Sequence, residues 1–159
     1  MPQEMFLERA QPIADALTKR LAPYCKKVEV AGSIRRRRPR VHDIDIILIP
    51  NDLWSLHGEI LRIGRVCMSG VKTCQVMIGE VQVDIYFATE ETWATLLLIR
   101  TGSAENNIRL CSTAKKKGWH LAADGTGLFN EAGARIAGDT ELSIYQALGL
   151  PYQEPEERN

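Results

Sequence analysis

The chain has 159 residues, of which 45% are hydrophobic and 25% charged, a composition that excludes a disordered or low-complexity protein. A chain of this length is expected to fold as one domain, or as one domain with a small appendage, around its own core. The 20 basic and 20 acidic side chains give zero net charge, so the field of the whole molecule would not by itself attract nucleic acid or an anionic membrane. The charges are nevertheless segregated, with basic runs at residues 35–40 and 115–117 and an acidic tail at residues 154–157.

The sequence shows no feature of export or of membrane insertion. Gln3 and Glu4 stand where a signal peptide would have basic and apolar residues, and the longest apolar runs, residues 44–49 and 96–99, are too short to span a bilayer. Four cysteines lie far apart without a C-x-x-C pair, which predicts neither a zinc site nor a disulfide framework: Cys25, Cys67, Cys74 and Cys111. We therefore expect a soluble cytoplasmic protein with reduced thiols and no membrane partner.

The first half of the chain alternates between helix and strand patterns. Residues 3–22 are predicted to form a helix that Pro12 should kink or interrupt and Pro23 should close. Strands are predicted at residues 27–34 and 43–49, the second of them apolar apart from two aspartates, as expected of a strand covered on both faces. Asp52 is expected to cap a short helix that ends before Gly64. Three strands should follow, with Gly79-Glu80 as the hairpin turn between the last two: residues 65–68, 73–78 and 81–87.

The second half is predicted to be mainly helical. A helix over residues 92–99 should break at Thr101-Gly102-Ser103 and resume to Lys117, with Gly118 as its C-terminal stop. A small hairpin is expected over residues 119–130, and an amphipathic helix over residues 139–148. We therefore predict an α+β fold, with a mixed β-sheet flanked by helices in residues 1–90 and a smaller helical and hairpin unit in residues 91–159.

Three carboxylates stand in apolar predicted strands. Asp43 and Asp45 lie two residues apart on one strand, so they share a face with Cα atoms about 6.6 Å apart, and Asp84 lies between Val83 and Ile85 on another. Because burial of an uncompensated carboxylate is costly, we expect these acids to be paired or to bind metal. If the strands are neighbours, the acids could hold two Mg²⁺ or Mn²⁺ ions about 4 Å apart. Alternatively, Asp43 caps the strand while Asp45 and Asp84 pair with arginines of residues 35–40.

Two glycine-containing segments have the features of phosphate sites. Gly32 and Ser33 follow a predicted strand, where glycine lets backbone amides approach a phosphate and serine adds a hydroxyl donor. Arg36 could then clamp the anion bidentately, unless the basic run is simply solvated or paired with the acids. Gly102 and Ser103 precede a helix whose amides and dipole favour an anion, although an ordinary helix cap is the alternative.

The order of these elements along the chain is a more specific indication of a protein family than any one element alone. Through GSIRR (32–36), DID (43–45), VDIYF (83–87) and TGSAENNIRLCSTAKKKGW (101–119), the sequence resembles the family X DNA polymerases, the relatives of DNA polymerase beta within the nucleotidyltransferase superfamily. The resemblance runs from the first predicted helix to residue 159. It implies a nucleotidyltransferase-type palm (1–90) and a thumb-like subdomain (91–159), without the lyase and fingers domains of larger relatives.

The resemblance also implies roles for the acids and for the first phosphate element. Asp43 and Asp45 would ligate both metals. Asp84 would bind the catalytic metal and help to activate a primer 3′-hydroxyl. In the Gly32-containing loop, Ser33 and Arg36 would hold the β and γ phosphates of an incoming nucleoside triphosphate.

In the second half, the resemblance implies that Gly102 and Ser103 border the sugar and that Asn107 reaches the base or the minor-groove edge. The chain departs from the family pattern at positions other than the metal ligands: His42, Gln82, Ile99-Arg100 and Cys111. Three lysines could contact nucleic-acid phosphates, although exposed lysines at such places are more often simply solvated: Lys72, Lys115 and Lys116.

These features predict a metal-dependent DNA nucleotidyltransferase that adds nucleotides to a DNA 3′ end with release of pyrophosphate, in gap filling or repair. Its expected partners are nucleoside triphosphates and a gapped or recessed primer and template, and we expect a monomer. Two alternatives stay open. The same chemistry could act on a small molecule, a protein or an RNA end, or the fold could be a non-catalytic module that binds nucleotides or DNA.

Overall fold

The computed structural model describes residues 3–159. The start of the chain, where we expect no signal peptide, therefore has its first two residues outside the described part. The chain divides into two compact units, the first ending at Ala88 and the second spanning Thr89–Asn159. Each unit buries a hydrophobic cluster drawn from its own residues. The two units are therefore described separately.

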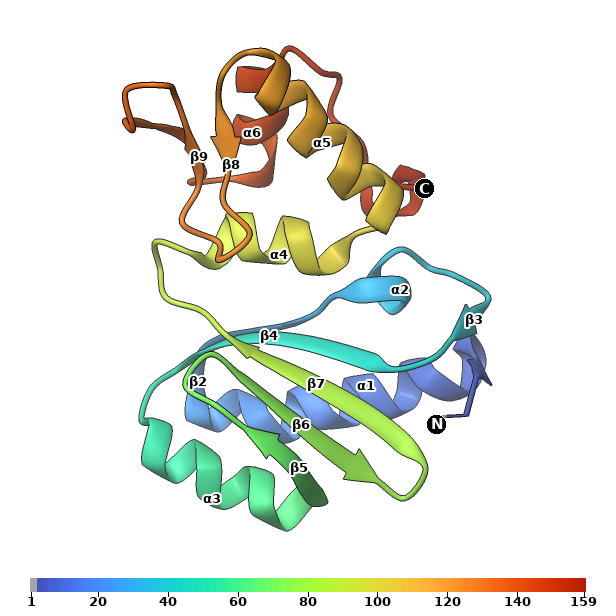
Figure 1. The fold of residues 1–159 in the computed structure, drawn as a ribbon. Coiled ribbons are helices and arrows are strands. Elements are labelled where there is room, and N and C mark those ends of the chain that lie inside the picture. The colour runs from blue at the N-terminus through green and yellow to red at the C-terminus, as the bar shows by residue number, and fades with distance from the viewer. Residues whose placement is uncertain (1–2) are drawn as a thin grey trace. The chain divides into compact units, whose positions relative to one another are not determined.

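The first unit is built on a five-stranded sheet with the strand order β2-β4-β7-β6-β5 (Figure 1). The central strands β4 and β7 run parallel, and the other neighbouring strands pair antiparallel, which confirms the prediction of a mixed sheet. The strands are β2 (Cys25–Val30), β4 (Ile44–Pro50), β5 (Arg65–Ser69), β6 (Thr73–Ile78) and β7 (Val81–Phe87).

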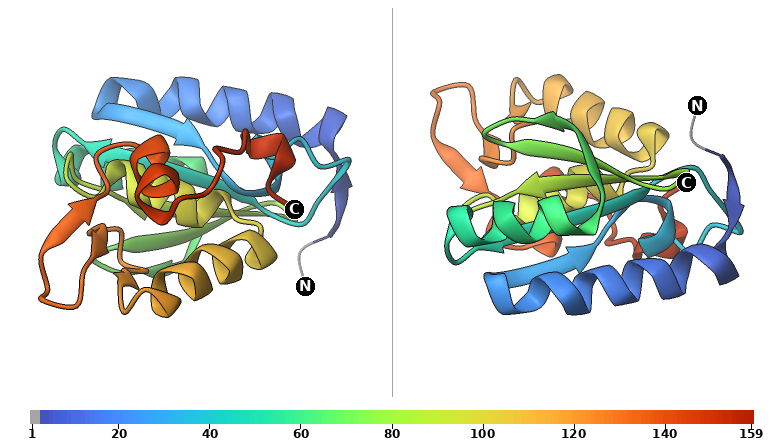
Figure 2. Two further views of the ribbon diagram at one scale, coloured as in Figure 1. Left: turned by 90° about the horizontal axis from the view of Figure 1, so that it is seen from above. Right: turned by 90° about the horizontal axis from the view of Figure 1, so that it is seen from below.

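Two helices cover one face of this sheet. The view from below in Figure 2 shows α1 (Leu7–Leu21) and α3 (Leu53–Ile63) side by side on that face. The core beneath them includes Ile44, Ile46 and Leu48, which alternate along β4 with residues that point to the other face. The side chain of Asp45 therefore lies on the sheet face opposite α1 and α3.

The start of the chain differs from the predicted helix. Residues Met5–Phe6 form a short strand, β1, paired with β3 (Arg40–Val41), and α1 begins only at Leu7. Pro12 lies inside α1 without interrupting it. Pro12 is exposed, so the carbonyl that loses its amide partner there can be satisfied by water. A 3₁₀ turn, η1 (Ala22–Tyr24), contains Pro23 and ends the helical segment.

The predicted strand at residues 27–34 is wrong in its second half. Strand β2 ends at Val30, and Gly32–Arg35 form a single helical turn, α2. Gly32 has a φ of 62°, a left-handed conformation that a β-strand does not accommodate. By contrast, the Asp52 cap is confirmed, because its carboxylate accepts the backbone amides of Trp54 and Ser55 at 3.2 and 3.3 Å.

The second unit is helical with a small sheet, as predicted. It contains the helices α4 (Trp93–Thr101), α5 (Ala104–Lys116) and α6 (Glu141–Leu148). It also contains a three-stranded sheet with the strand order β10-β9-β8. The pair β8 (His120–Leu121) and β9 (Leu128–Phe129) forms the predicted hairpin, whereas β10 (Arg135–Ala137) and the 3₁₀ turn η2 (Pro155–Glu157) were not predicted.

Two further expectations can be compared with the structure. Every helix within residues 3–159 falls short of the length and apolar character that crossing a membrane requires. The four cysteines are free thiols in the structure.

Candidate active site

The three predicted acids converge on one face of the five-stranded sheet. Asp45 on β4 lies directly opposite Asp84 on β7 in the parallel register, and Asp43 immediately precedes β4. Each residue offers one carboxylate oxygen, and these oxygens lie within 4.8 Å of one another. The pairing of β4 with β7 therefore brings together side chains that are about forty residues apart in sequence.

This cluster has the composition and spacing of a divalent-cation site. Oxygen ligands suit Mg²⁺ or Mn²⁺, and three carboxylate oxygens within 4.8 Å of one another can reach a common cation. Burial raises the pKa of Asp43 above its ordinary value of 3.8, and the negative charge of Asp84 and a hydrogen bond with it act in the same direction, while His42 opposes them. The acids repel one another, so a cation would relieve that repulsion.

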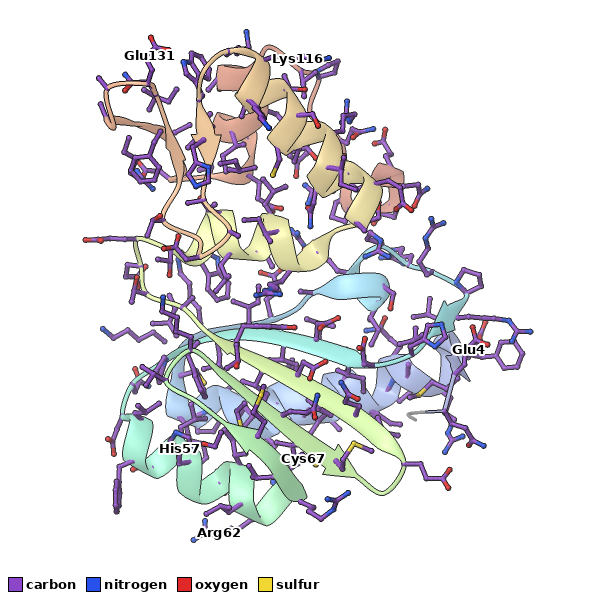
Figure 3. All side chains as sticks on the ribbon, viewed as in Figure 1. Glu4, His57, Arg62, Cys67, Lys116 and Glu131 are labelled. Atoms are coloured by element: carbon purple, nitrogen blue, oxygen red, sulfur yellow. The ribbon has the colours of Figure 1, made fainter. Side chains whose placement is uncertain are left out.

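Asp84 is held by two glutamines rather than by arginines. Gln82 Nε2 donates to both carboxylate oxygens at 3.2 and 3.1 Å, and Gln75 Nε2 donates to Oδ1 at 3.1 Å. Within residues 3–159, no basic side chain pairs with Asp84, which contradicts the alternative in which it pairs with residues 35–40. One residue of that run, Arg40, instead pairs with Glu4 at 3.0 Å, at the site labelled in Figure 3.

Gln75 was missed in the sequence analysis, although a signal for it existed. A hairpin turn at Gly79-Glu80 pairs Ile78 with Val81, and counting back along both strands places Gln75 opposite Asp84. Tyr86, two residues beyond Asp84 and on the same face, was also missed. Its hydroxyl donates to Asp45 Oδ1 at 3.4 Å.

Asp45 is fixed by its backbone and by a neighbouring glycine. The carbonyl of Asp45 accepts the Ala31 amide at 2.8 Å, which brings the residue after Ala31 against the carboxylate. A Cβ atom on Gly32 would lie 2.1 Å from Asp45 Oδ2. Position 32 therefore needs glycine both for this close approach and for its positive φ.

The first predicted phosphate element lies in the same unit as the acids. Ser33 is in the helical turn α2, directly after Gly32, and Arg36 ends that turn. The amides of Arg36 and Arg38 donate to the carbonyls of Gly32 and Ser33 at 3.1 and 2.9 Å. Within the described chain, the amides of Ser33 and Ile34 have no backbone acceptor, as expected of a turn that could receive an anion.

The second predicted element belongs to the Thr89–Asn159 unit. Helix α4 ends at Thr101, Gly102 has a φ of 70°, and the Ser103 side chain accepts the Asn106 amide at 3.2 Å as the N-cap of α5. The helix-cap alternative is thus correct for the Ser103 hydroxyl. Asn107 Nδ2 donates to the Ile99 carbonyl at 2.9 Å, whereas its Oδ1 has no hydrogen-bond partner among residues 3–159.

The three lysines predicted as nucleic-acid contacts lie at exposed positions. Lys72 is in the turn between β5 and β6. Lys115 and Lys116 are in the last turn of α5, where Figure 3 labels Lys116. Their contact with nucleic acid stays a prediction.

Comparisons with known proteins agree with this architecture. Residues 96–159 match the model of the DNA polymerase beta thumb. The chain is 30% identical to "DNA polymerase/3′-5′ exonuclease PolX" of Bacillus subtilis (strain 168), over 99% of this chain but only 29% of that relative. It is 27% identical to "Repair DNA polymerase X" of African swine fever virus (isolate Warthog/Namibia/Wart80/1980), over 84% of this chain and 82% of the relative.

A third relative covers the chain only in part. DNA polymerase lambda of Rattus norvegicus is 33% identical over 49% of this chain and 15% of its own length. The chain thus spans less than a third of the bacterial relative and most of the viral one. The thumb match and these relatives make the chain similar to the family X DNA polymerases, and the acidic cluster on adjacent sheet strands agrees with that similarity.

Proposed function

We propose that the chain is a metal-dependent DNA polymerase that adds nucleotides to a DNA 3′ end with release of pyrophosphate. We further propose that it acts as a monomer on gapped or recessed DNA during repair. The observation that carries the proposal is the cluster of Asp43, Asp45 and Asp84, whose oxygens lie within 4.8 Å of one another. The names of the relatives, which are DNA polymerases, favour DNA over other acceptors.

The acids would hold the metal, and the turn beside them would hold the nucleotide. When bound, two Mg²⁺ ions would activate the attacking hydroxyl and neutralise charge on the triphosphate. Ser33, the adjacent free amides of α2 and Arg36 would bind the terminal phosphates, and the glutamines would keep Asp84 oriented. Positioning and charge neutralisation are sufficient for phosphoryl transfer of this kind.

The residues of the second unit would contact the rest of the nucleotide. Gly102 and Ser103 would border the sugar. Asn107 would offer its unpartnered Oδ1 to the base edge, because the Ile99 carbonyl already fixes its Nδ2 group.

The proposal predicts that Asp45→Asn removes nucleotide incorporation. The substitution keeps the shape of the side chain but removes one negative charge from the cluster, so incorporation should fall by at least about a hundredfold. The measurement is primer extension on gapped, recessed and single-stranded DNA with deoxy- and ribonucleotides in Mg²⁺ or Mn²⁺. Asp15→Asn is the matched control, because Asp15 is an exposed residue of α1.

The second part of the test is removal of the metal. A chelator should stop incorporation by the unchanged protein, and added Mg²⁺ should restore it. Full activity of Asp45→Asn would contradict the assignment of the acids. A primer-independent product on a small molecule, a protein or an RNA end would contradict the assignment of the acceptor.

A further inference from the structure

The second unit buries a complete guanidinium group. Arg158 has no exposed surface and is the largest fully buried side chain of the described chain. Its Nη1 donates to Glu141 Oε2 at 2.6 Å, its Nε to the Gln153 carbonyl at 3.0 Å, and its Nη2 to the Tyr152 hydroxyl at 3.2 Å. Because the guanidinium is planar and its donors are fixed, Arg158 can make all three hydrogen bonds at once only in one orientation of its side chain.

Aromatic rings enclose the same group. The guanidinium carbon lies 5.6 Å from the ring centroid of Tyr145 and 5.6 Å from that of Tyr152. These two rings pack edge to face with centroids 5.3 Å apart. The side chain of Arg158 therefore fixes the backbone of residue 158 against α6 and the segment that follows it.

The fixed backbone reaches the turn between α4 and α5. The carbonyl of Arg158 accepts the Ser103 amide at 3.2 Å. A second contact supports the same turn, because Asn106 Nδ2 donates to the Tyr145 hydroxyl at 3.1 Å. The Ser103 hydroxyl in turn accepts the Asn106 amide, so the turn is tied to the Arg158 pocket through its backbone and through Asn106.

We propose that Arg158 is a positioning residue that sets the Gly102-Ser103 turn for the nucleotide. The inference rests on the proposed function, since it assigns the turn to the nucleotide sugar. Loss of the guanidinium would remove its hydrogen bonds to Glu141 and to the Gln153 carbonyl and would release the backbone of residue 158. The Ser103 amide would then lose its fixed acceptor. The acids and the metal they would hold would not be affected.

The test compares Arg158→Met with Leu148→Ala. Leu148 is a buried residue of α6 in the same core, so its truncation destabilises the unit without removing a partner of Arg158. We expect Arg158→Met to raise the KM for the nucleotide by about tenfold or more while kcat per active molecule stays within about threefold. Leu148→Ala should leave that KM unchanged, because partial unfolding lowers the active fraction and not the affinity of the folded molecules.

Two further variants keep the inference testable if Arg158→Met does not fold. Tyr152→Phe removes one acceptor and should raise the same KM by a smaller factor. Arg158→Lys keeps the positive charge beside Glu141 but loses the planar arrangement of N–H donors. Its KM should therefore lie between those of the unchanged protein and Arg158→Met. An unchanged KM in every Arg158 and Tyr152 variant would overturn the inference.

Amide hydrogen exchange separates this inference from the proposed function. Exchange at the Ser103 amide should be at least about tenfold faster in Arg158→Met than in Leu148→Ala, whether or not the protein incorporates nucleotides. Equal exchange in the two variants would overturn the positioning role. Absence of incorporation by the unchanged protein would instead overturn the proposed function.

Discussion

At the scale of single residues, Gly32 shapes the acidic cluster by having no side chain. Its φ of 62° and its close approach to Asp45 both exclude a Cβ atom, since that atom would lie 2.1 Å from Oδ2 and 2.9 Å from Cγ. A substitution must therefore move the carboxylate or the turn. The same glycine thus connects the phosphate element to the acids.

This arrangement predicts that Gly32→Ala impairs activity more than stability. An alanine at positive φ costs about 1–2 kcal/mol, and displacement of Asp45 should lower incorporation by at least about tenfold. Gly58→Ala on α3 is the matched control, because a Cβ atom there would meet no atom within 4 Å. The control should keep full incorporation and be at least as stable. Denaturant unfolding and primer extension of both variants would provide the comparison, and equal activity would contradict the role of Gly32.

Residue identity alone predicted the acids but not all of their partners. Asp43, Asp45 and Asp84 were recognisable because an acid in an apolar strand needs compensation. Gln82 was noted only as a departure from the family pattern, and Gln75 looked like an ordinary polar residue. Their role depends on the register of β6 against β7, which is a property of the pairing and not of either residue.

At the scale of elements, Glu59 ties α3 to α1 and to the segment after it. Its carboxylate accepts Arg20 Nε at 2.6 Å, Arg62 Nη1 at 3.2 Å and the Tyr24 hydroxyl at 3.4 Å. The hydrogen bond from Arg20 lowers the pKa of Glu59 below its ordinary value of 4.5, although burial opposes this shift. The ionised form is therefore favoured by folding.

The lowered pKa predicts an acid-dependent loss of stability. Because the folded pKa lies below the unfolded one, the contribution of Glu59 is complete above about pH 4.5 and is lost as the pH falls through the folded value. The difference in free energy of unfolding between the unchanged protein and Glu59→Gln should shrink accordingly on acidification. Urea unfolding across a pH series measures it. A pH-independent difference for Glu59→Gln would contradict the prediction.

Elements were predictable where the local pattern and the tertiary structure agree. Strands β4, β6 and β7 and helix α3 carry clear periodicity and end signals such as Asp52 and Gly64. Strands β1 and β10 have only 2 and 3 residues, too few for an alternating pattern to be visible in the sequence. They form because they pair with β3 and β9. Residues 32–35 look like a continuation of β2 in sequence, but Gly32 has a positive φ that ends the strand, and the chain forms the turn α2 there.

At the scale of the whole molecule, zero net charge limits how the chain can bind a polyanion. Attraction must come from local groups, since the summed charge gives none. The end of α5 is one such place, with three consecutive lysines of which Lys117 lies over the ring of Trp119 at 5.4 Å. Contact of Lys115 and Lys116 with phosphate stays a prediction.

Replacement of Lys115 and Lys116 by alanine tests whether this local charge binds DNA. If both lysines contact phosphates, the slope of log affinity against log salt should become shallower by about 1.8 on duplex DNA, with similar weakening on all sequences. The control replaces Lys19 and Lys26, two exposed lysines whose loss changes the net charge equally. Fluorescence anisotropy at several salt concentrations measures both slopes. Because local contacts and not net charge would carry the binding, the control should keep the original slope. Equal changes in the two double variants would show that only the total charge matters.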